Sequence, residues 1–213
     1  MIKSHTPESA PGNPNIVAVP YTYFNSSEPS FFGRRRRYDA RNIVEINGKS
    51  ALAEDIESDS SNQLATSLLL LPEHIVPRLE EYADELAAGG VSQEGLYTGQ
   101  GEVVRNCASF VSAMAGVEFD HRLLNDTANF NGWTPEERGP DYQPEPGEFV
   151  IYAKPEPQKW MHWGVGVGGD VPGVIGLGGP NGHGLTISSS PDLAVLAMGH
   201  KTTHTAHHPQ IAA

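Results

Sequence analysis

The chain is poor in cysteine, in basic residues and in long apolar runs. Its 213 residues contain one cysteine, Cys107, which excludes an internal disulfide. Lys and Arg total 14 against 26 Asp and Glu, and the net charge of -12 argues against nonspecific nucleic-acid binding. No apolar run is long enough for a transmembrane segment, because Leu68 to Leu71 is stopped by Pro72. The residues after Met1 also lack the apolar stretch of a signal peptide.

Motifs for metals and phosphate cofactors are missing as well. The sequence has no cysteine pair, no His-Glu-x-x-His motif and no glycine-rich phosphate loop before a helix, so we expect neither a metal nor a cofactor. Four histidines lie in the tail: His200, His204, His207 and His208. Three of them, spaced by four residues, would align on a helix and could bind a metal. The segment is rich in Thr and follows a glycine, so we predict no functional metal site there.

What the chain does have is glycine (23) and proline (17), typical of a loop-rich α+β domain. We expect residues 1–15 to be disordered, 16–199 to form one domain with its core at about 95–199, and 200–213 to be a flexible tail. The expected strands cover 15–24, 41–49 with an Asn-Gly turn, 185–189 and 193–198. The expected helices are a short helix or buried segment over 63–71 and a helix from Pro77 to Gly89. The long segment 120–142 should contain a short helix near 134–138 or form a functional flap. The basic run Arg34 to Arg37 is either a solvated edge or a grip on an anionic polymer.

The stretch around Cys107 predicts a reactive thiol. Asn106 is a good N-cap, which places Cys107 at the first position of a helix that Gly116 ends. Apolar residues at Phe110, Val111 and Met114 form its buried stripe. The helix dipole would lower the pKa of a thiol at this position. The alternative is that Cys107 is a small buried apolar residue.

A base for this thiol is expected on a later strand. Residues 146–152 read as a turn followed by a strand, and residues 161–170 as a second strand. In the second strand, His162, Gly164 and Gly166 point the same way, so the face beyond the histidine carries no side chains. A bare face lets another backbone, a helix or a substrate come close. His162 is therefore a plausible base for the thiol.

These three pieces together resemble the papain-like cell-wall hydrolases, namely the NlpC-type peptidases and the CHAP amidases. The matching segments are Asn106–Val111, Pro146–Val150 and His162–Val167, within a similarity that covers about residues 100 to 190. The resemblance implies a papain-like α+β fold, with a nucleophile-bearing helix packed on an antiparallel sheet and an N-terminal extension. Two departures stand out: Asn106 replaces the usual Asp, and Ala108-Ser109 replaces Ser-Gly.

The third residue of such a site should orient the imidazole, and three candidates remain open. Asn181 lies nineteen residues after His162, similar to the spacing in CHAP amidases, and His183 would share its face in an extended segment. Asp170 ends the histidine strand. The glycines around Asn181 could equally form a simple turn. The next strand, where the NlpC-type pattern puts this residue, has Gly176 between two aliphatic residues.

Substrate contacts are expected from the surroundings of the same pair. Trp160 and Trp163 flank His162, Asn106 precedes the cysteine, and Tyr97 lies in the connection that helps to form the cleft in the related hydrolases. The alternative for the aromatic residues is ordinary core packing.

The resemblance implies a cysteine hydrolase that cleaves an amide bond in the stem peptides of peptidoglycan. Without a signal or a wall-binding repeat, we expect an antibacterial effector, cytoplasmic in its producer, that acts in the target periplasm and pairs with an immunity protein. One alternative is a cysteine deamidase, protease or acyltransferase acting on a host protein or lipid. Another is a binding module that lacks activity.

Overall fold

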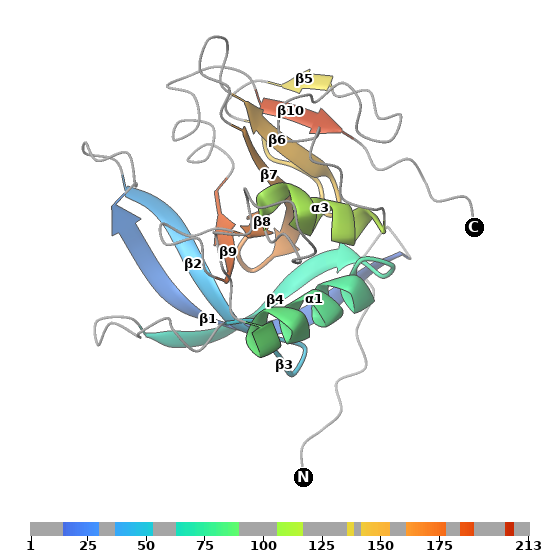
Figure 1. Cartoon of the computed structure of the whole chain (residues 1–213). Coiled ribbons are helices and arrows are strands. Elements are labelled where there is room, and N and C mark those ends of the chain that lie inside the picture. The colour runs from blue at the N-terminus through green and yellow to red at the C-terminus, as the bar shows by residue number, and fades with distance from the viewer. Residues whose placement is uncertain are drawn as a thin grey trace.

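The protein is mostly β, and the expectation of a papain-like α+β fold is wrong. The structure, a computed structural model, is described here for residues 15–29, 37–52, 63–89, 106–116, 136–138, 142–153, 161–177, 184–189 and 203–206. Within these residues, six antiparallel strands close into a barrel, and the two helices are short (Figure 1). N-terminal strands form part of this barrel, so they are not an extension added to a separate sheet.

The barrel follows an order that differs from the order in the chain. Going round it, the strands are β4 (Leu64–Pro72), β1 (Ile16–Pro29), β2 (Arg37–Ile46), β9 (Leu185–Ser188), β8 (Gly173–Leu177) and β7 (Met161–Gly169). β7 then pairs with β4 to complete the ring. Residues 63–71, expected as a short helix or buried segment, are thus largely strand β4. Nine consecutive residue pairs with β1 override the helical interpretation of this leucine-rich run.

The ring closes at two glycines. Gly168 and Gly169 lie opposite Leu70 and Leu69, and Gly169 has a φ of 105°, which favours glycine. A Cβ at Gly169 would collide with the carbonyl oxygen of Leu68. Asp170 extends the pairing, because its amide donates to the Leu68 carbonyl at 3.1 Å and its Oδ2 accepts from the Leu68 amide at 3.0 Å. The side chain of Asp170 therefore takes the place of a strand carbonyl at the seam.

Further strands extend the sheet from β7. β6 (Phe149–Ala153) pairs with β7, β10 (Thr203–Ala206) pairs with β6, and β5 (Glu136–Arg138) pairs with β10. Two expectations are corrected here: residues 136–138 form a strand instead of a helix, and residues 203–206 of the tail belong to the sheet. Pairing with distant strands, which local sequence does not reveal, accounts for both.

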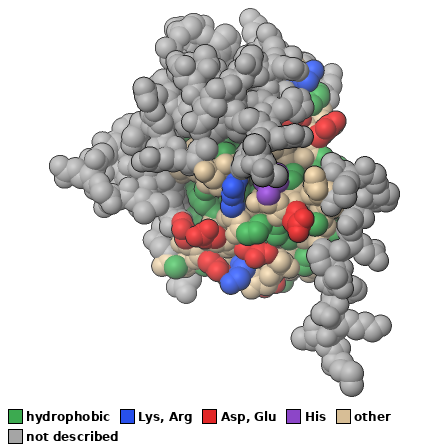
Figure 2. Space-filling view, turned by 90° about the vertical axis from the view of Figure 1, so that its right-hand side faces the viewer, with side chains coloured by type: hydrophobic (Ala, Val, Ile, Leu, Met, Phe, Trp, Pro, Cys, Tyr) green, Lys and Arg blue, Asp and Glu red, His purple; other side chains and the backbone are tan. Residues whose placement is uncertain are grey.

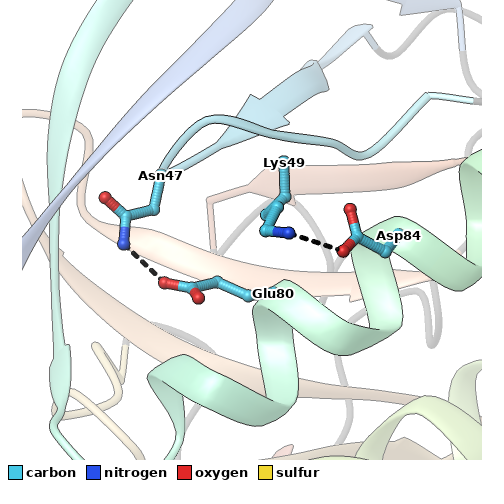
Figure 3. Close-up of polar contacts among 4 residues, drawn as sticks. All are labelled: Asn47, Lys49, Glu80 and Asp84. Atoms are coloured by element: carbon cyan, nitrogen blue, oxygen red, sulfur yellow. Dashed lines mark hydrogen bonds and ion pairs between the residues drawn. The ribbon is translucent and has the colours of Figure 1, made fainter.

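The Asn-Gly turn and the first helix form as expected. Asn47 and Gly48 have φ values of 47° and 80° and link β2 to β3 (Lys49–Ser50). Helix α1 (Val76–Gly89) buries Leu79, Tyr82, Ala83 and Leu86. Its polar side holds the turn in place, because Asn47 donates to Glu80, and Lys49 and Asp84 form an ion pair at 2.9 Å (Figure 3).

The second helix, α3 (Cys107–Ala115), packs on β7 and β8 (Figure 1). Phe110, Val111 and Met114 are fully buried in one core with Trp163 and Val165, which confirms the predicted stripe. Among the described residues, neither helix has the length and apolar character needed to cross a membrane. Acidic side chains are scattered among apolar and basic ones on the face seen in Figure 2.

Candidate functional site

The start of α3 is fixed by a reciprocal cap around Asn106. Its Oδ1 accepts a hydrogen bond from the Ser109 amide at 2.8 Å, and its own amide donates to Ser109 Oγ at 2.8 Å. This is a capping box, with Ser in the place usually taken by Glu or Gln. The predicted N-cap, helix start and Gly116 stop are confirmed. Gly116 adopts a φ of 68°, as left-handed C-caps do.

Cys107 opens the helix with a half-buried side chain. Its thiol takes part in a hydrogen bond with the backbone of Trp163, the residue that follows His162 on β7. The amides of Cys107 and Ala108 also favour the thiolate, as expected at a helix start. Burial nevertheless outweighs these bonds and raises the pKa of the Cys107 thiol. The expected lowering of this pKa is therefore wrong, because desolvation is the larger effect.

His162 lies near the start of β7, also half-buried. It is paired with Tyr152 of β6, and the two rings stack with centroids 6.5 Å apart. Burial lowers the pKa of His162 from 6.5 to about 4, so its imidazole is neutral at pH 7. A neutral imidazole is the form that can accept a proton from a thiol.

The imidazole also borders β8 at Gly176. A Cβ built at Gly176 would lie 3.4 Å from Nε2 of His162, in ordinary van der Waals contact, so Gly176 directly borders the ring. In the NlpC-type pattern this strand carries the third polar residue. Here Gly176 has no side chain that could orient the imidazole.

The bare face of β7 is covered by neighbouring backbone and, at Gly164, also by a side chain. A Cβ at Gly166 would collide with the Glu145 carbonyl, and one at Gly164 would collide with the Val174 side chain and lie 2.8 Å from the Ile175 carbonyl. Gly166 also exchanges hydrogen bonds with the segment before β6, accepting from Gly147 at 2.8 Å and donating to Glu148 at 2.7 Å. Another backbone, rather than a helix or a space for substrate, therefore lies close to Gly166 on this face.

The candidates for the third residue separate clearly. Asp170 lies at the opposite end of β7 from His162, a separation on the order of 25 Å for an extended strand. It closes the barrel and does not contact the imidazole. Asn181 and His183 lie outside the described residues.

Only two of the four residues expected to contact substrate lie within the described part of the chain. Trp163 is 0% exposed and belongs to the core, so it does not line a cleft. Asn106 serves as the N-cap described above. Tyr97 and Trp160 lie outside the described residues, as do Arg34 to Arg36, His200, His207 and His208. Arg37 begins β2 and His204 lies in β10.

Sequence reasoning missed a buried polar cluster before β6. Glu148 is 3% exposed, and its carboxylate accepts from the Tyr142 hydroxyl at 3.0 and 2.8 Å and from the Glu145 amide at 3.0 Å. Burial, and then the bond to Glu148, raise the pKa of Tyr142 to about 12. The Arg138 guanidinium lies 5.1 Å from the Tyr142 ring. Glu148, the acidic residue of the Pro-Gly-Glu motif, thus stabilises the turn before β6. In the sequence, the glycine of this motif was the only sign that a turn lies here.

The described part of the chain contains no group of three or more His, Cys, Asp or Glu side chains placed to hold a metal ion. Comparison of the chain with protein-family models, with curated proteins and with solved structures found no match in any of the three.

Proposed function

We propose that the protein is a cysteine hydrolase in which Cys107 is the nucleophile and His162 the base. One observation carries this proposal: the Cys107 thiol is hydrogen-bonded to the backbone of the residue next to His162. In support of the proposal, the only thiol in the sequence, at a helix start, contacts the strand that carries a neutral imidazole. Nucleophile and base within reach of each other are the signature of nucleophilic catalysis.

The reaction then runs through a thioester. His162 accepts the thiol proton as sulfur attacks the amide carbonyl, and the imidazolium donates that proton to the departing amine. Water, deprotonated by His162, attacks the thioester, releasing the carboxylic acid and restoring the thiol. Because burial raises the thiol pKa and keeps the imidazole neutral, the resting pair is uncharged. Proton transfer should therefore accompany the attack and not precede it.

The proposed substrate is an amide bond in peptidoglycan stem peptides. This choice rests on the three motifs that resemble cell-wall hydrolases, and the barrel architecture adds nothing to it. Purified sacculi are therefore the substrate to test first, with a host-type protein such as casein as the probe for the protease alternative.

The test measures new amino and carboxyl groups released from sacculi. The wild type should release both, and Cys107→Ala and His162→Gln should each abolish release. Ser112→Ala is the matched control, because it removes only a buried bond from the Ser112 hydroxyl to the Ala108 carbonyl within the same helix. Equal release by wild type and Cys107→Ala would end the hydrolase proposal.

A second candidate is a binding module without activity. The pKa shifts that favour the neutral thiol, and the absence of a side chain at Gly176, support this candidate. It predicts that sacculi bind wild type and Cys107→Ala equally and that neither releases new groups. Hydrolysis by the wild type would exclude it.

A further inference from the structure

The side-chain amide of Asn106 has a donor with no visible partner. Its Nδ2 atom is buried, and no hydrogen-bond acceptor for it exists among the described residues. A buried donor without an acceptor is destabilising, so such atoms in a folded protein call for an explanation. Asn106 directly precedes Cys107, which places this donor at the same end of α3 as the thiol.

The cap fixes which atom of the amide is the donor. The Ser109 amide can only donate, so the side-chain atom that it contacts at 2.8 Å must be the oxygen. The capping box uses Oδ1 and leaves the N–H groups of Nδ2 unused. These N–H groups are held in place before any ligand arrives, which is the condition for an effective electrostatic contribution to catalysis.

Capping alone does not require asparagine. Ser and Asp cap helices about as well as Asn does, and Asp also suits the positive end of the dipole. Neither offers an amide N–H, and Asp would add a negative charge beside a developing thiolate. What asparagine adds at this position is a neutral donor.

Resting on the proposed function, we propose that Asn106 supplies an oxyanion donor. When sulfur attacks the carbonyl carbon, the S–C bond forms, the π electrons move to oxygen, and the thiol proton passes to His162. Nδ2 of Asn106 donates a hydrogen bond to that oxygen, together with the backbone amide of Cys107. The ligand class is therefore any acyl group whose carbonyl oxygen reaches the start of α3.

An aldehyde tests this without knowledge of the substrate. A thiol adds to an aldehyde to give a hemithioacetal whose oxygen occupies the oxyanion position, whereas alkylation by iodoacetamide proceeds by displacement and develops no charge there. The probe is N-acetylglycinal labelled with ¹³C at the aldehyde carbon, titrated into full-length protein and followed by NMR. We expect Asn106→Ser to weaken hemithioacetal formation roughly tenfold, the effect of one lost hydrogen bond, and to leave the rate of alkylation unchanged.

Two further variants complete the design. Asn106→Asp keeps the cap and the shape but not the donor, and should weaken aldehyde binding at least as much as Asn106→Ser. Ser112→Ala should bind the aldehyde as the wild type does, which controls for a loosened helix. Thermal unfolding of each variant verifies that it is folded.

The possible outcomes separate failure of the proposed role of Asn106 from failure of the hydrolase proposal. If wild type forms the hemithioacetal at Cys107 and Asn106→Ser binds it equally tightly, the role of Asn106 is refuted and the hydrolase proposal stands. If wild type forms none, both are refuted. Loss of aldehyde binding and alkylation together in Asn106→Ser would show that the residue acts only through the helix, which also overturns the inference.

Discussion

The backbone of Trp163 is hydrogen-bonded to the thiol of Cys107, although 56 positions separate the two residues in the sequence (163 − 107). The Trp163 side chain points into the core, which anchors this strand under the helix. The contact brings sulfur to the backbone beside His162. Burial of the thiol also affects its reactivity.

The first prediction concerns thiol reactivity. Because burial raises the pKa of Cys107, its thiolate fraction at pH 7 is smaller than that of an unperturbed cysteine. Iodoacetamide should alkylate native Cys107 more slowly at pH 7 than it alkylates the same residue in urea-unfolded protein. The native rate should still be rising with pH above pH 9. Faster alkylation of the native thiol would mean that the helix dipole outweighs burial.

The second prediction is a pH dependence of stability that originates at His162. Its pKa is about 4 in the folded state and 6.5 when exposed, so the unfolded chain binds the proton more tightly. Stability from this group is present above pH 6.5 and is lost as the pH falls toward 4, by up to about 3 kcal/mol, less a reduction for the partial exposure of His162. Urea unfolding between pH 7 and 4 should show a smaller loss in His162→Gln. An equal loss in both proteins would place the effect elsewhere.

Some features of the fold and of the candidate site could be predicted from the sequence, and others could not. The helix at Cys107 was predictable because its cap, apolar stripe and final glycine are all local signals, as is the Asn47-Gly48 turn. The closed barrel was not, since it depends on β4 meeting β7 at Gly169 and on N-terminal strands entering the same ring. The thiol pKa was predicted in the wrong direction because a sequence displays the helix dipole and not the burial. The papain-like fold implied by the resemblance is wrong, although α3 does pack on the strand that carries His162.

The third prediction compares two glycines with positive φ. Gly116 ends α3 at a φ of 68°, and Arg78 of α1 donates to the Met114 carbonyl at 2.7 Å there. A Cβ at Gly116 would lie 2.6 Å from the Arg78 guanidinium carbon, whereas one at Gly48, at a φ of 80°, would meet nothing. Both Ala variants should lose about 1 kcal/mol from backbone strain, and Gly116→Ala should lose about 1 kcal/mol more with the helix-to-helix bond.

Chemical denaturation of the two variants measures this difference. Adding Arg78→Ala to Gly116→Ala should cost little further, because the bond is already lost. Equal destabilisation by the two glycine variants would show that the Arg78 contact contributes nothing.

The fourth prediction concerns the barrel seam at Asp170. Asp170→Ala removes the acceptor of the Leu68 amide and should cost about 1 kcal/mol. Hydrogen exchange at Leu68 should accelerate, while Asp170→Asn, which keeps a side-chain oxygen, should stay close to wild type. Hydrolysis of sacculi should survive both substitutions. If a folded Asp170→Asn variant lost hydrolysis, Asp170 would again be a candidate for the third catalytic residue.

The most direct test of the central claim is to trap the acyl group on sulfur. Full-length protein is incubated with soluble muropeptides, quenched in acid within the first turnovers, and analysed by intact and peptide mass spectrometry. The account predicts an acyl adduct on Cys107 that hydroxylamine removes, and that is absent in His162→Gln. A wild type that releases amines from muropeptides without any adduct on Cys107, or an adduct that forms equally in His162→Gln, would contradict the pairing of this thiol with this imidazole.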